Sequence, residues 1–534
     1  MIPVIQVVLL LLVVIAAVAV LAARLKVPPA ILLVLTGVVL ALFPRLPTVR
    51  LAPEFVLLIV LPPVIYSSAV AMSWREFRFN LRPISLLAVG CVVFTTVAVA
   101  ASTHWLLGLP WAVGFVVGAI VSPPDAVAPL AIARRMQLPR RILVILEGEG
   151  LANDATALIL YRFAVAAVSI GVFSFGHALT QFAAIVVGEI IWGMAVGWMM
   201  LRLRRWVREP RIEILLSVLT PFVAYWPPEY LGGSGVLATV IAGLYISWNG
   251  LRLISAETRL QGIFFWDFLI YLTEGLIFLI TGLQARGLIA GIRGYSLSHL
   301  AISGAVVCAV VIVARFIWMF PAAYVPRWLS PALARRDPSP PWQTPFALAF
   351  TGIRGIVSLA AALAIPLTIE NGQPFPERDL ILFLTFAVIL VTLVGQGLLF
   401  PAVMRALGLA NAGRREHHTD RVEELAARRL AIEAAIERLE ELAAARSLAS
   451  DIVQPIRSRL RDRLKHLGRR IAEDNSQTEL ITLHDETERD LITAERDLIN
   501  DLYRRGKLKD EARRRIERDL DLRDAHMSNL LAEE

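Results

Sequence analysis

The apolar residues of this chain are gathered into long runs, and this pattern constrains the fold more than any other feature of the sequence. Crossing the roughly 30 Å hydrocarbon core of a bilayer takes about 20 apolar residues in a helix. With 57% hydrophobic and only 18% charged residues over 534 positions, the chain holds many runs of that length. A soluble globule, a disordered chain and a simple water-soluble enzyme are therefore excluded, and an all-α polytopic membrane protein is predicted.

Thirteen membrane spans are predicted in the first 412 residues. The first run has neither a basic leader nor a small-residue cleavage site, so we expect it to remain as a helix. The predicted spans are residues 4–24, 28–44, 51–72, 84–106, 111–132, 143–171, 177–203, 213–230, 234–248, 263–288, 297–325, 344–367 and 379–407.

The loops between these spans alternate in basic charge, which predicts an orientation and an odd number of spans. With the N-terminus outside, the inner loops carry 19 Lys and Arg residues and the outer loops five. The inner ones are Arg24, Lys26, Arg75, Arg78, Arg82, Arg134, Arg135, Arg140, Arg141, Arg202, Arg204, Arg205, Arg208, Arg211, Arg252, Arg259, Arg327, Arg335 and Arg336. The outer ones are Arg45, Arg50, Arg286, Arg293 and Arg378. The expected location is the cell (inner) membrane.

A charged segment follows the predicted spans. Residues 413–534 hold 28 acidic and 25 basic side chains, so the net positive charge of the chain belongs to residues 1–412. Basic residues beside spans set orientation and meet anionic lipid, so no nucleic-acid partner is inferred. The periodicity of RVEELAARRLAIEAAIERLEELA predicts a helical cytoplasmic tail. This tail could regulate or dimerise the protein, or remain a solvated appendage.

The fifth span contains VSPPDAVAP, in which Pro123, Pro124 and Pro129 each lack a backbone donor. Such a cluster should interrupt the helix around Asp125 at mid-membrane. Interrupted helices expose carbonyls and half-helix ends that transporters use to hold small ions. The alternative is a simple proline kink with Asp125 paired structurally.

The sixth span places Glu149, Asn153 and Asp154 in LEGEGLANDATALILY. Glu149 and Asn153 are four residues apart and share a helix face, whereas Asp154 lies about 100° further round. One helix could therefore serve two polar partners. Charged side chains near the bilayer centre cost about 2.5–3.5 kcal/mol each on insertion scales, so each is a candidate functional residue.

Two arginines lie in later spans. Arg354, between Gly352 and Gly355 in the twelfth span, needs a counter-charge, and Glu149 is the leading candidate. Arg315 in the eleventh span is either a second internal cation or a side chain that reaches the inner edge. Glu274 is a weaker candidate for cavity polarity.

Three motifs together resemble the sodium/proton exchangers of the cation:proton antiporter family 1, bacterial branch. They are GEGLAND from Gly148 to Asp154, SPPDAVA from Ser122 to Ala128, and GIRGIVSLA from Gly352 to Ala360. The resemblance covers about residues 5–410. It implies inverted repeats with broken helices crossing at mid-membrane, a homodimer, and exchange of an alkali cation, sodium first, for protons.

The resemblance also implies roles for individual residues. Asp154 would bind the cation and the proton, with Asn153 supporting it and Asp125 acting from the broken helix, while Glu149 and Arg354 would form a structural ion pair. Accessory residues would be Ser67, Ser122, Pro124, Gly150, Glu274 and Arg315. Two departures bear on cation choice, because Ser67 and Gly150 stand where the family often has an acid and a serine.

The expected exchange is electroneutral and one-for-one, because Asn153 adds no second titratable proton. No cofactor and no enzyme activity are expected. The sequence leaves two other functions open. A cation channel could use the same buried acids, and GGSG at 232–235 resembles the serine motif of intramembrane proteases, although no histidine lies deep in a predicted span.

Overall fold

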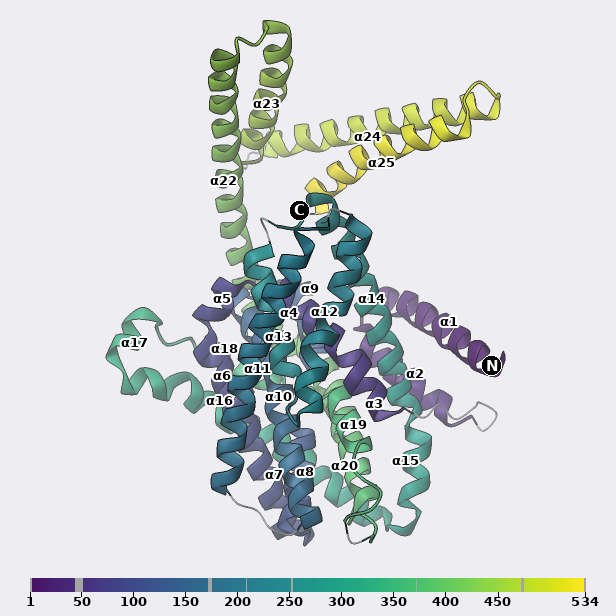
Figure 1. Cartoon of the computed structure of the whole chain (residues 1–534), viewed down its shortest axis with the longest axis vertical. Helices are drawn as coiled ribbons and strands as arrows, with labels where there is room; N and C mark the ends of the chain where they lie inside the picture. Colours follow the sequence, from purple (N-terminus) through teal and green to yellow (C-terminus); the bar gives the residue numbers. More distant parts are fainter. Residues whose placement is uncertain are drawn as a thin grey trace. The chain divides into compact units, whose positions relative to one another are not determined.

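The structure is a computed structural model that describes residues 2–43, 51–170, 175–207, 209–250, 253–370, 372–471 and 475–532. The chain divides into two compact units, residues 1–414 and 415–534. The sequence placed this division between residues 412 and 413. Helices make up both units, and no strand occurs among the described residues (Figure 1). Of the predicted loop arginines, Arg45, Arg50, Arg208 and Arg252 lie outside the described residues, as does the side chain of Arg293.

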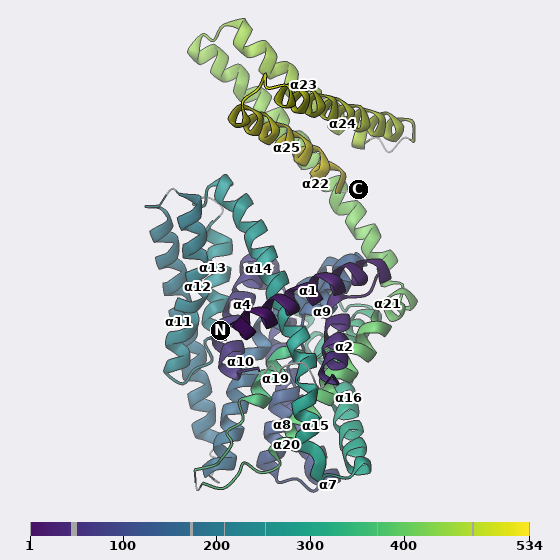
Figure 2. The ribbon, with the colours of Figure 1, turned by 90° about the vertical axis from the view of Figure 1, so that its right-hand side faces the viewer.

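The first unit is a bundle of helices that lie mostly side by side (Figure 2). Its first half contains α1 (Ile2–Leu25), α2 (Pro29–Ala41), α3 (Pro53–Phe55), η1 (Val56–Val60), α4 (Leu61–Ala71), α5 (Trp74–Phe79), α6 (Leu81–Ser85), η2 (Leu86–Cys91), α7 (Val92–Leu107), α8 (Trp111–Val121), α9 (Val127–Arg135) and α10 (Arg140–Ile170). The later part contains α11 (Phe175–Arg204), α12 (Pro210–Tyr230), α13 (Val236–Gly250), α14 (Ala256–Leu283), α15 (Ala285–Gly291), η3 (Ile292–Gly294), α16 (Leu297–Leu329), α17 (Pro331–Arg336), α18 (Gln343–Phe350), α19 (Ile356–Leu363), α20 (Arg378–Leu390), η4 (Val391–Gln396) and α21 (Gly397–Ala406).

Every predicted span coincides with a helix, or with consecutive shorter helices, in this unit. Among the described residues, eight helices are long and apolar enough to cross a membrane, and three shorter ones are apolar. The fifth and twelfth spans are each split into two short helices, which do not meet a length criterion for a span. A multi-pass membrane protein is therefore confirmed, whereas the count of thirteen spans stays a prediction.

Two helix breaks meet inside the bundle. The first, residues 122–126, separates α8 from α9 and holds Pro123 and Pro124, which lack backbone donors, while Pro129 lies in the first turn of α9. The second, residues 351–355, separates α18 from α19 and holds two glycines. The backbone N–H of Asp125 donates to the carbonyl of Ile353 at 2.7 Å, which joins the two breaks directly. The predicted interruption and crossing of these spans are confirmed.

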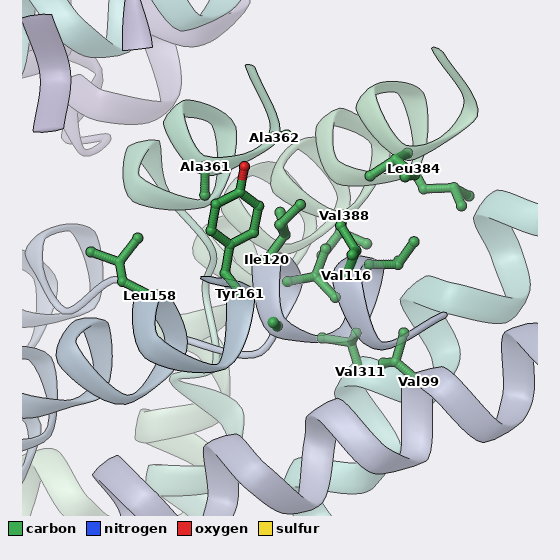
Figure 3. Packing of buried hydrophobic residues seen from close by; sticks show 14 of the residues in the cluster. Val99, Val116, Ile120, Leu158, Tyr161, Val311, Ala361, Ala362, Leu384 and Val388 are labelled. Atoms are coloured by element: carbon green, nitrogen blue, oxygen red, sulfur yellow. The ribbon is translucent and has the colours of Figure 1, made fainter. Parts of the chain in front are cut away.

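Apolar packing fixes the half-helices around these breaks. Val116 and Ile120 of α8 belong to one buried cluster with Tyr161 of α10, Ala361 of α19 and Val388 of α20 (Figure 3). Close packing of such side chains makes a core resist displacement, because shifting one member opens voids or forces overlaps. The cluster therefore holds the broken helices at a fixed distance from α10.

The second unit consists of α22 (Leu409–Arg446, which begins in the first unit), α23 (Ser450–Ile471), α24 (Asn475–Arg504) and α25 (Asp510–Ala532). Ile492 of α24 and Leu520 of α25 are buried against each other's helix, with Ile516 packed alongside. Many other side chains are charged and exposed, and several form ion pairs three or four residues apart, such as Arg429 with Glu433. The helical tail predicted from the sequence is present.

Candidate ion-binding site

A cavity of about 380 Å³ reaches the crossing of the two helix breaks. Its polar lining includes Asp125 from the first break and Asp154 from α10. Ser67 of α4 and Glu274 of α14 also line it. A cavity of this size holds many water molecules, because a single water molecule needs a cavity volume of only about 10–15 Å³. Water can therefore approach the carboxylates at the centre of the unit.

Helix α10 presents different residues on two faces, as its sequence predicted. Glu149 and Asn153 are fully buried, whereas Asp154 is partly exposed and lines the cavity. Within the described part of the chain, the Asp154 carboxylate has no hydrogen bond and no ion pair. A carboxylate in this position has open coordination sites for a cation or a proton.

Asn153 ties α10 to the broken helix. Its side-chain Nδ2 donates to the carbonyl of Pro124 at 2.6 Å, a carbonyl that the proline-rich break leaves without a helical partner. The amide Oδ1 of Asn153 is buried and has no partner among the described residues. Asn153 thus fixes the distance between the Asp154 helix and the first break.

Asp125 lies where two half-helices begin. Its Oδ1 accepts a hydrogen bond from Val127 N at 2.9 Å, at the first residue of α9. Its Oδ2 packs against Gly355, the residue before α19, so closely that a Cβ at position 355 would overlap the carboxylate. The N-terminal end of a helix carries partial positive charge, which stabilises a carboxylate placed there. Glycine at 355 is therefore required by Asp125.

Arg354 lies where the other two half-helices end, and here the sequence prediction was wrong. Its side chain does not pair with Glu149. Instead, Nε donates to the carbonyl of Val121 at 3.0 Å and Nη2 to that of Ser122 at 3.4 Å, while Nη1 donates to the carbonyl of Gly352. These carbonyls lie at or just after the C-terminal ends of α8 and α18, where partial negative charge gathers. Arg354 therefore neutralises backbone dipoles and not a carboxylate.

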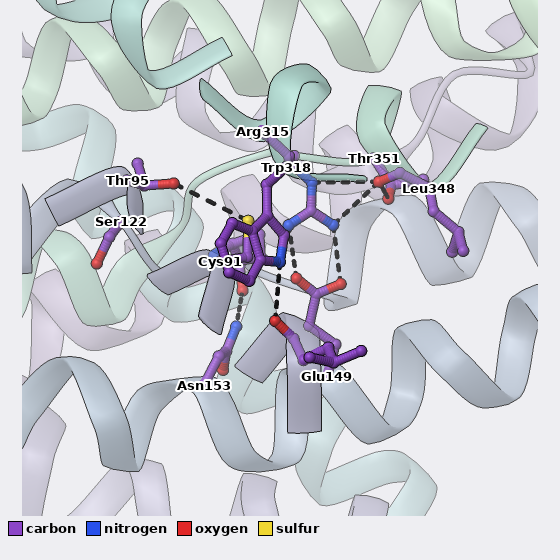
Figure 4. A network of polar contacts seen from close by, with 12 residues as sticks. Cys91, Thr95, Ser122, Glu149, Asn153, Arg315, Trp318, Leu348 and Thr351 are labelled. Atoms are coloured by element: carbon purple, nitrogen blue, oxygen red, sulfur yellow. Dashed lines mark hydrogen bonds and ion pairs between the residues drawn. The ribbon is translucent and has the colours of Figure 1, made fainter. Parts of the chain in front are cut away.

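Glu149 pairs with Arg315. Arg315 Nη1 lies 2.5 Å from Oε1 of Glu149 and Nη2 lies 2.8 Å from Oε2, which makes a bidentate pair with both side chains 1% exposed (Figure 4). Nε and Nη2 of Arg315 also donate to the carbonyl of Leu348 in α18, at 3.1 and 3.0 Å. Of the two positions predicted for Arg315, the internal one is observed.

Four of the accessory residues reach the cavity, whereas Ser122 and Arg315 do not. Ser67, Pro124, Gly150 and Glu274 line it. Ser122 is buried, with its hydroxyl on the carbonyl of Ala119 at 3.2 Å. A Cβ at Gly150 would lie 2.5 Å from the Cβ of Ala126, so the space for a serine there is already occupied.

The GGSG segment has a structural role. Glu189 of α11 is buried, and its carboxylate accepts hydrogen bonds from the backbone N–H groups of Ser234, Gly235 and Leu237 at 2.7–3.1 Å. These groups precede or begin α13, so Glu189 caps that helix. The hydroxyl of Ser234 also faces Glu189, at 3.4 Å from each oxygen, and Ser234 is fully buried. The motif supports no protease site.

Two contributions were not predicted from the sequence. The hydroxyl of Thr392 in η4 accepts the backbone N–H of Arg354 at 3.0 Å, which orients the second break. Arg378 donates to the carbonyls of Leu363 and Ile365, at 3.3 and 3.1 Å, and so closes the end of α19. Neither residue stands in a distinctive motif, and their roles depend on the fold bringing distant segments together.

Comparison with known proteins agrees with this geometry. The family model described as "Sodium/hydrogen exchanger, transmembrane" matches residues 8–406. An uncharacterized Na⁺/H⁺ exchanger of Mycobacterium tuberculosis is 38% identical over 390 residues, which cover 72% of this chain and 71% of that protein. The Na⁺/H⁺ antiporter ApNhaP of Aphanothece halophytica is 31% identical over 491 residues, covering 90% and 89%.

One solved structure shares the fold. The sodium proton antiporter MjNhaP1 from Methanocaldococcus jannaschii superposes with a TM-score of 0.61 at 21% identity, covering 76% of this chain and 98% of that chain. At this identity the match concerns the fold alone. The part of the chain outside the match is similar in length to the charged helical tail.

Proposed function

The chain belongs to the sodium/hydrogen exchanger family, and on that premise we propose that it is a secondary active antiporter in which Asp154 carries either a monovalent cation or a proton. The observation that carries this proposal is the exposure of the Asp154 carboxylate to the cavity without a fixed partner. This carboxylate faces a cavity of about 380 Å³ at the crossing of two broken helices and has no hydrogen bond or ion pair within the described chain. The similar proteins are named as Na⁺/H⁺ exchangers, which makes sodium the first cation to test.

Exchange follows from mutual exclusion at one carboxylate. A cation and a proton each neutralise the same negative charge, and neither binds well where the other already sits. The empty, charged carboxylate is costly to move through a low-dielectric barrier, so only loaded states cross. Transport in one direction is then coupled to transport in the other.

The neighbouring residues support this carboxylate in distinct ways. Asn153 holds the first break through the Pro124 carbonyl, and Asp125 contributes a second carboxylate at the start of α9 and α19. Arg354 offsets the negative ends of α8 and α18, so the crossing has no uncompensated helix dipole facing the ion. Ser67 and Glu274, which also line the cavity, are proposed to tune cation choice.

The exchange is proposed to be electroneutral. Asn153 stands beside Asp154 and cannot titrate, so this pair of neighbours supplies one exchangeable proton, from Asp154. One cation would then replace one proton. Transport in proteoliposomes that responds to membrane voltage alone, without ion gradients, contradicts this stoichiometry.

The wider setting is proposed from the charge pattern and the family. The N-terminus would lie outside and the tail in the cytoplasm of a cell that uses the exchanger for pH and cation homeostasis, with a homodimer as the working assembly. The cation-channel alternative gains no specific observation from the structure. A vesicle assay that follows cation-driven dissipation of a proton gradient, run for sodium, lithium and potassium, tests the proposed function directly. Absence of dissipation by every alkali cation would contradict it.

A further inference from the structure

A second polar cluster lies away from the ion cavity and plays no part in the proposed exchange. Asp337, at the end of α17, is surrounded by three arginines from separate elements. Arg82 Nη2 of α6 and Arg327 Nη2 of α16 each donate to its Oδ2 at 2.8 Å. Arg141 Nη2 of α10 lies 2.8 Å from Oδ1 and 3.0 Å from Oδ2, with hydrogen-bond geometry to Oδ2.

This cluster carries more positive charge than its one carboxylate can balance. Asp337 and Arg327 are 12% and 5% exposed, whereas Arg82 and Arg141 are 26% and 34% exposed, so solvent screens only part of the imbalance. Nε and Nη1 of Arg82 are buried and find no partner among the described residues. Leaving buried charged donors unpaired is costly, and an anion that accepts from them would offset that cost.

The structure provides space for such an anion. A pocket of about 50 Å³ is lined by Arg82, Arg141 and Arg327. Thr344 and Pro345, in the first turn of α18, form another part of its wall. The volume fits a few water-sized atoms, which suits a tetrahedral oxyanion group and excludes a large organic ligand.

We propose that this pocket, defined by Arg82, Arg141 and Arg327, binds a phosphate group. Guanidinium groups bind phosphate oxygens through paired, charge-assisted hydrogen bonds. The phosphate comes either from the headgroup of an anionic phospholipid or from solution. Exposed Trp328 and Trp342 flank the cluster in sequence, as aromatic residues do at the headgroup depth of a membrane, which favours the phospholipid.

Helix α18 connects this pocket to the buried Glu149–Arg315 pair. Leu348 lines the pocket, and its carbonyl accepts the two hydrogen bonds from Arg315 that accompany the Glu149 pair. A phosphate at the start of α18 therefore stabilises the half-helix that holds the buried ion pair. Stabilisation of the whole protein is the expected consequence, because a ligand bound only by the folded state raises its apparent stability.

The test uses the full-length protein in a neutral detergent and follows its thermal unfolding midpoint. The probes are dioctanoyl phosphatidylglycerol, dioctanoyl phosphatidylcholine and inorganic phosphate, with sodium chloride matching the ionic strength. We expect phosphatidylglycerol to raise the midpoint and phosphatidylcholine, whose choline cation is repelled by the cluster, to have a much smaller effect. Arg82→Gln should weaken the apparent affinity about tenfold to a hundredfold, which corresponds to losing a charge-assisted hydrogen bond.

Two further variants keep the test decisive. Arg78→Gln removes the same charge from an exposed position four residues away and should respond to phosphatidylglycerol like the wild type. Arg141→Gln leaves two arginines on Asp337 and should lose affinity as Arg82→Gln does. Stabilisation by phosphatidylglycerol alone identifies a lipid headgroup, and equal stabilisation by inorganic phosphate identifies a soluble phosphate. Equal responses of Arg82→Gln and Arg78→Gln, or no stabilisation by either phosphate source, overturn the proposal.

Discussion

Two carboxylates on one helix, Glu149 and Asp154, stand in opposite environments although only five residues separate them. Glu149 is sealed at 1% exposure and has both oxygens bound to the guanidinium of Arg315. Asp154 faces a cavity of about 380 Å³ without a hydrogen bond or ion pair in the described chain. The comparison shows that a buried acid becomes structural when a fixed cation saturates it and exchangeable when only water and mobile ions can reach it.

The largest effect is expected from a substitution that removes the exchangeable carboxylate. Asp154→Asn should lower cation-driven proton transport in vesicles by at least about a hundredfold, because the amide cannot exchange a proton for a cation. The amount of folded protein should change little, since Asp154 has no fixed partner to lose. A transport rate close to that of the wild type would remove Asp154 from the mechanism.

The structural carboxylate should respond in the reverse way. Arg315→Met leaves the Glu149 carboxylate buried and unpaired, which costs about 3–5 kcal/mol for such a pair. We expect a large loss of folded protein, measured as the monodisperse yield after detergent extraction. The double variant Glu149→Gln with Arg315→Met should recover much of that yield, and a double variant no better than Arg315→Met would contradict the pairing.

Arg354 offers a second structural test, in which the partners are carbonyls. Arg354→Ala should lower the folded yield more than it alters the apparent affinity for the cation, because it leaves the ends of α8 and α18 uncompensated. Both quantities can be measured on the same preparation. A normal yield with a strongly changed affinity would instead put Arg354 in the transport pathway.

A change in pH should distinguish the roles of Asp154 and Glu149 without a mutation. If a proton and a cation compete at Asp154, the cation concentration for half-maximal exchange should rise about tenfold per pH unit on the acid side. The maximal rate should vary less, and the stability of the Glu149–Arg315 pair should not follow this curve. A half-saturating concentration that stays constant between mildly alkaline and mildly acid pH would contradict competition.

The smallest expected effect concerns the cavity wall. Glu274→Gln removes a carboxylate that faces the cavity from α14, and Ser67→Ala removes a hydroxyl from α4. Each should change the relative rates for sodium, lithium and potassium by a few fold, because neither residue holds the exchanged charge. The rate ratios are measured in one vesicle preparation, with Asp154→Asn as the inactive reference.

Local geometry explains which parts of this site could be predicted. The two faces of α10 follow from helical periodicity, so the separation of Asn153 from Asp154 was predicted correctly. The prolines around Asp125 have a direct backbone consequence, and the break between α8 and α9 is present as expected.

The partner of Glu149 could not be predicted in the same way. Both Arg315 and Arg354 were available cations, and the choice depends on how segments 166 or more positions apart pack together. The two glycines beside Arg354 suggested the approach of an acid. Instead, Gly355 leaves room for the carboxylate of Asp125, and Arg354 donates to backbone carbonyls. The arginine cluster on Asp337 has the same origin, since its three arginines come from three separate helices.

The central claim is that one cation displaces one proton from Asp154, and proton release on cation binding tests it most directly. Purified protein in weakly buffered detergent solution is mixed with sodium at a pH where the proton-loaded form is populated, and the protons released per sodium bound are counted. The account predicts one proton for each sodium in the wild type and none in Asp154→Asn. Sodium binding without proton release, or release that persists in Asp154→Asn, would contradict it.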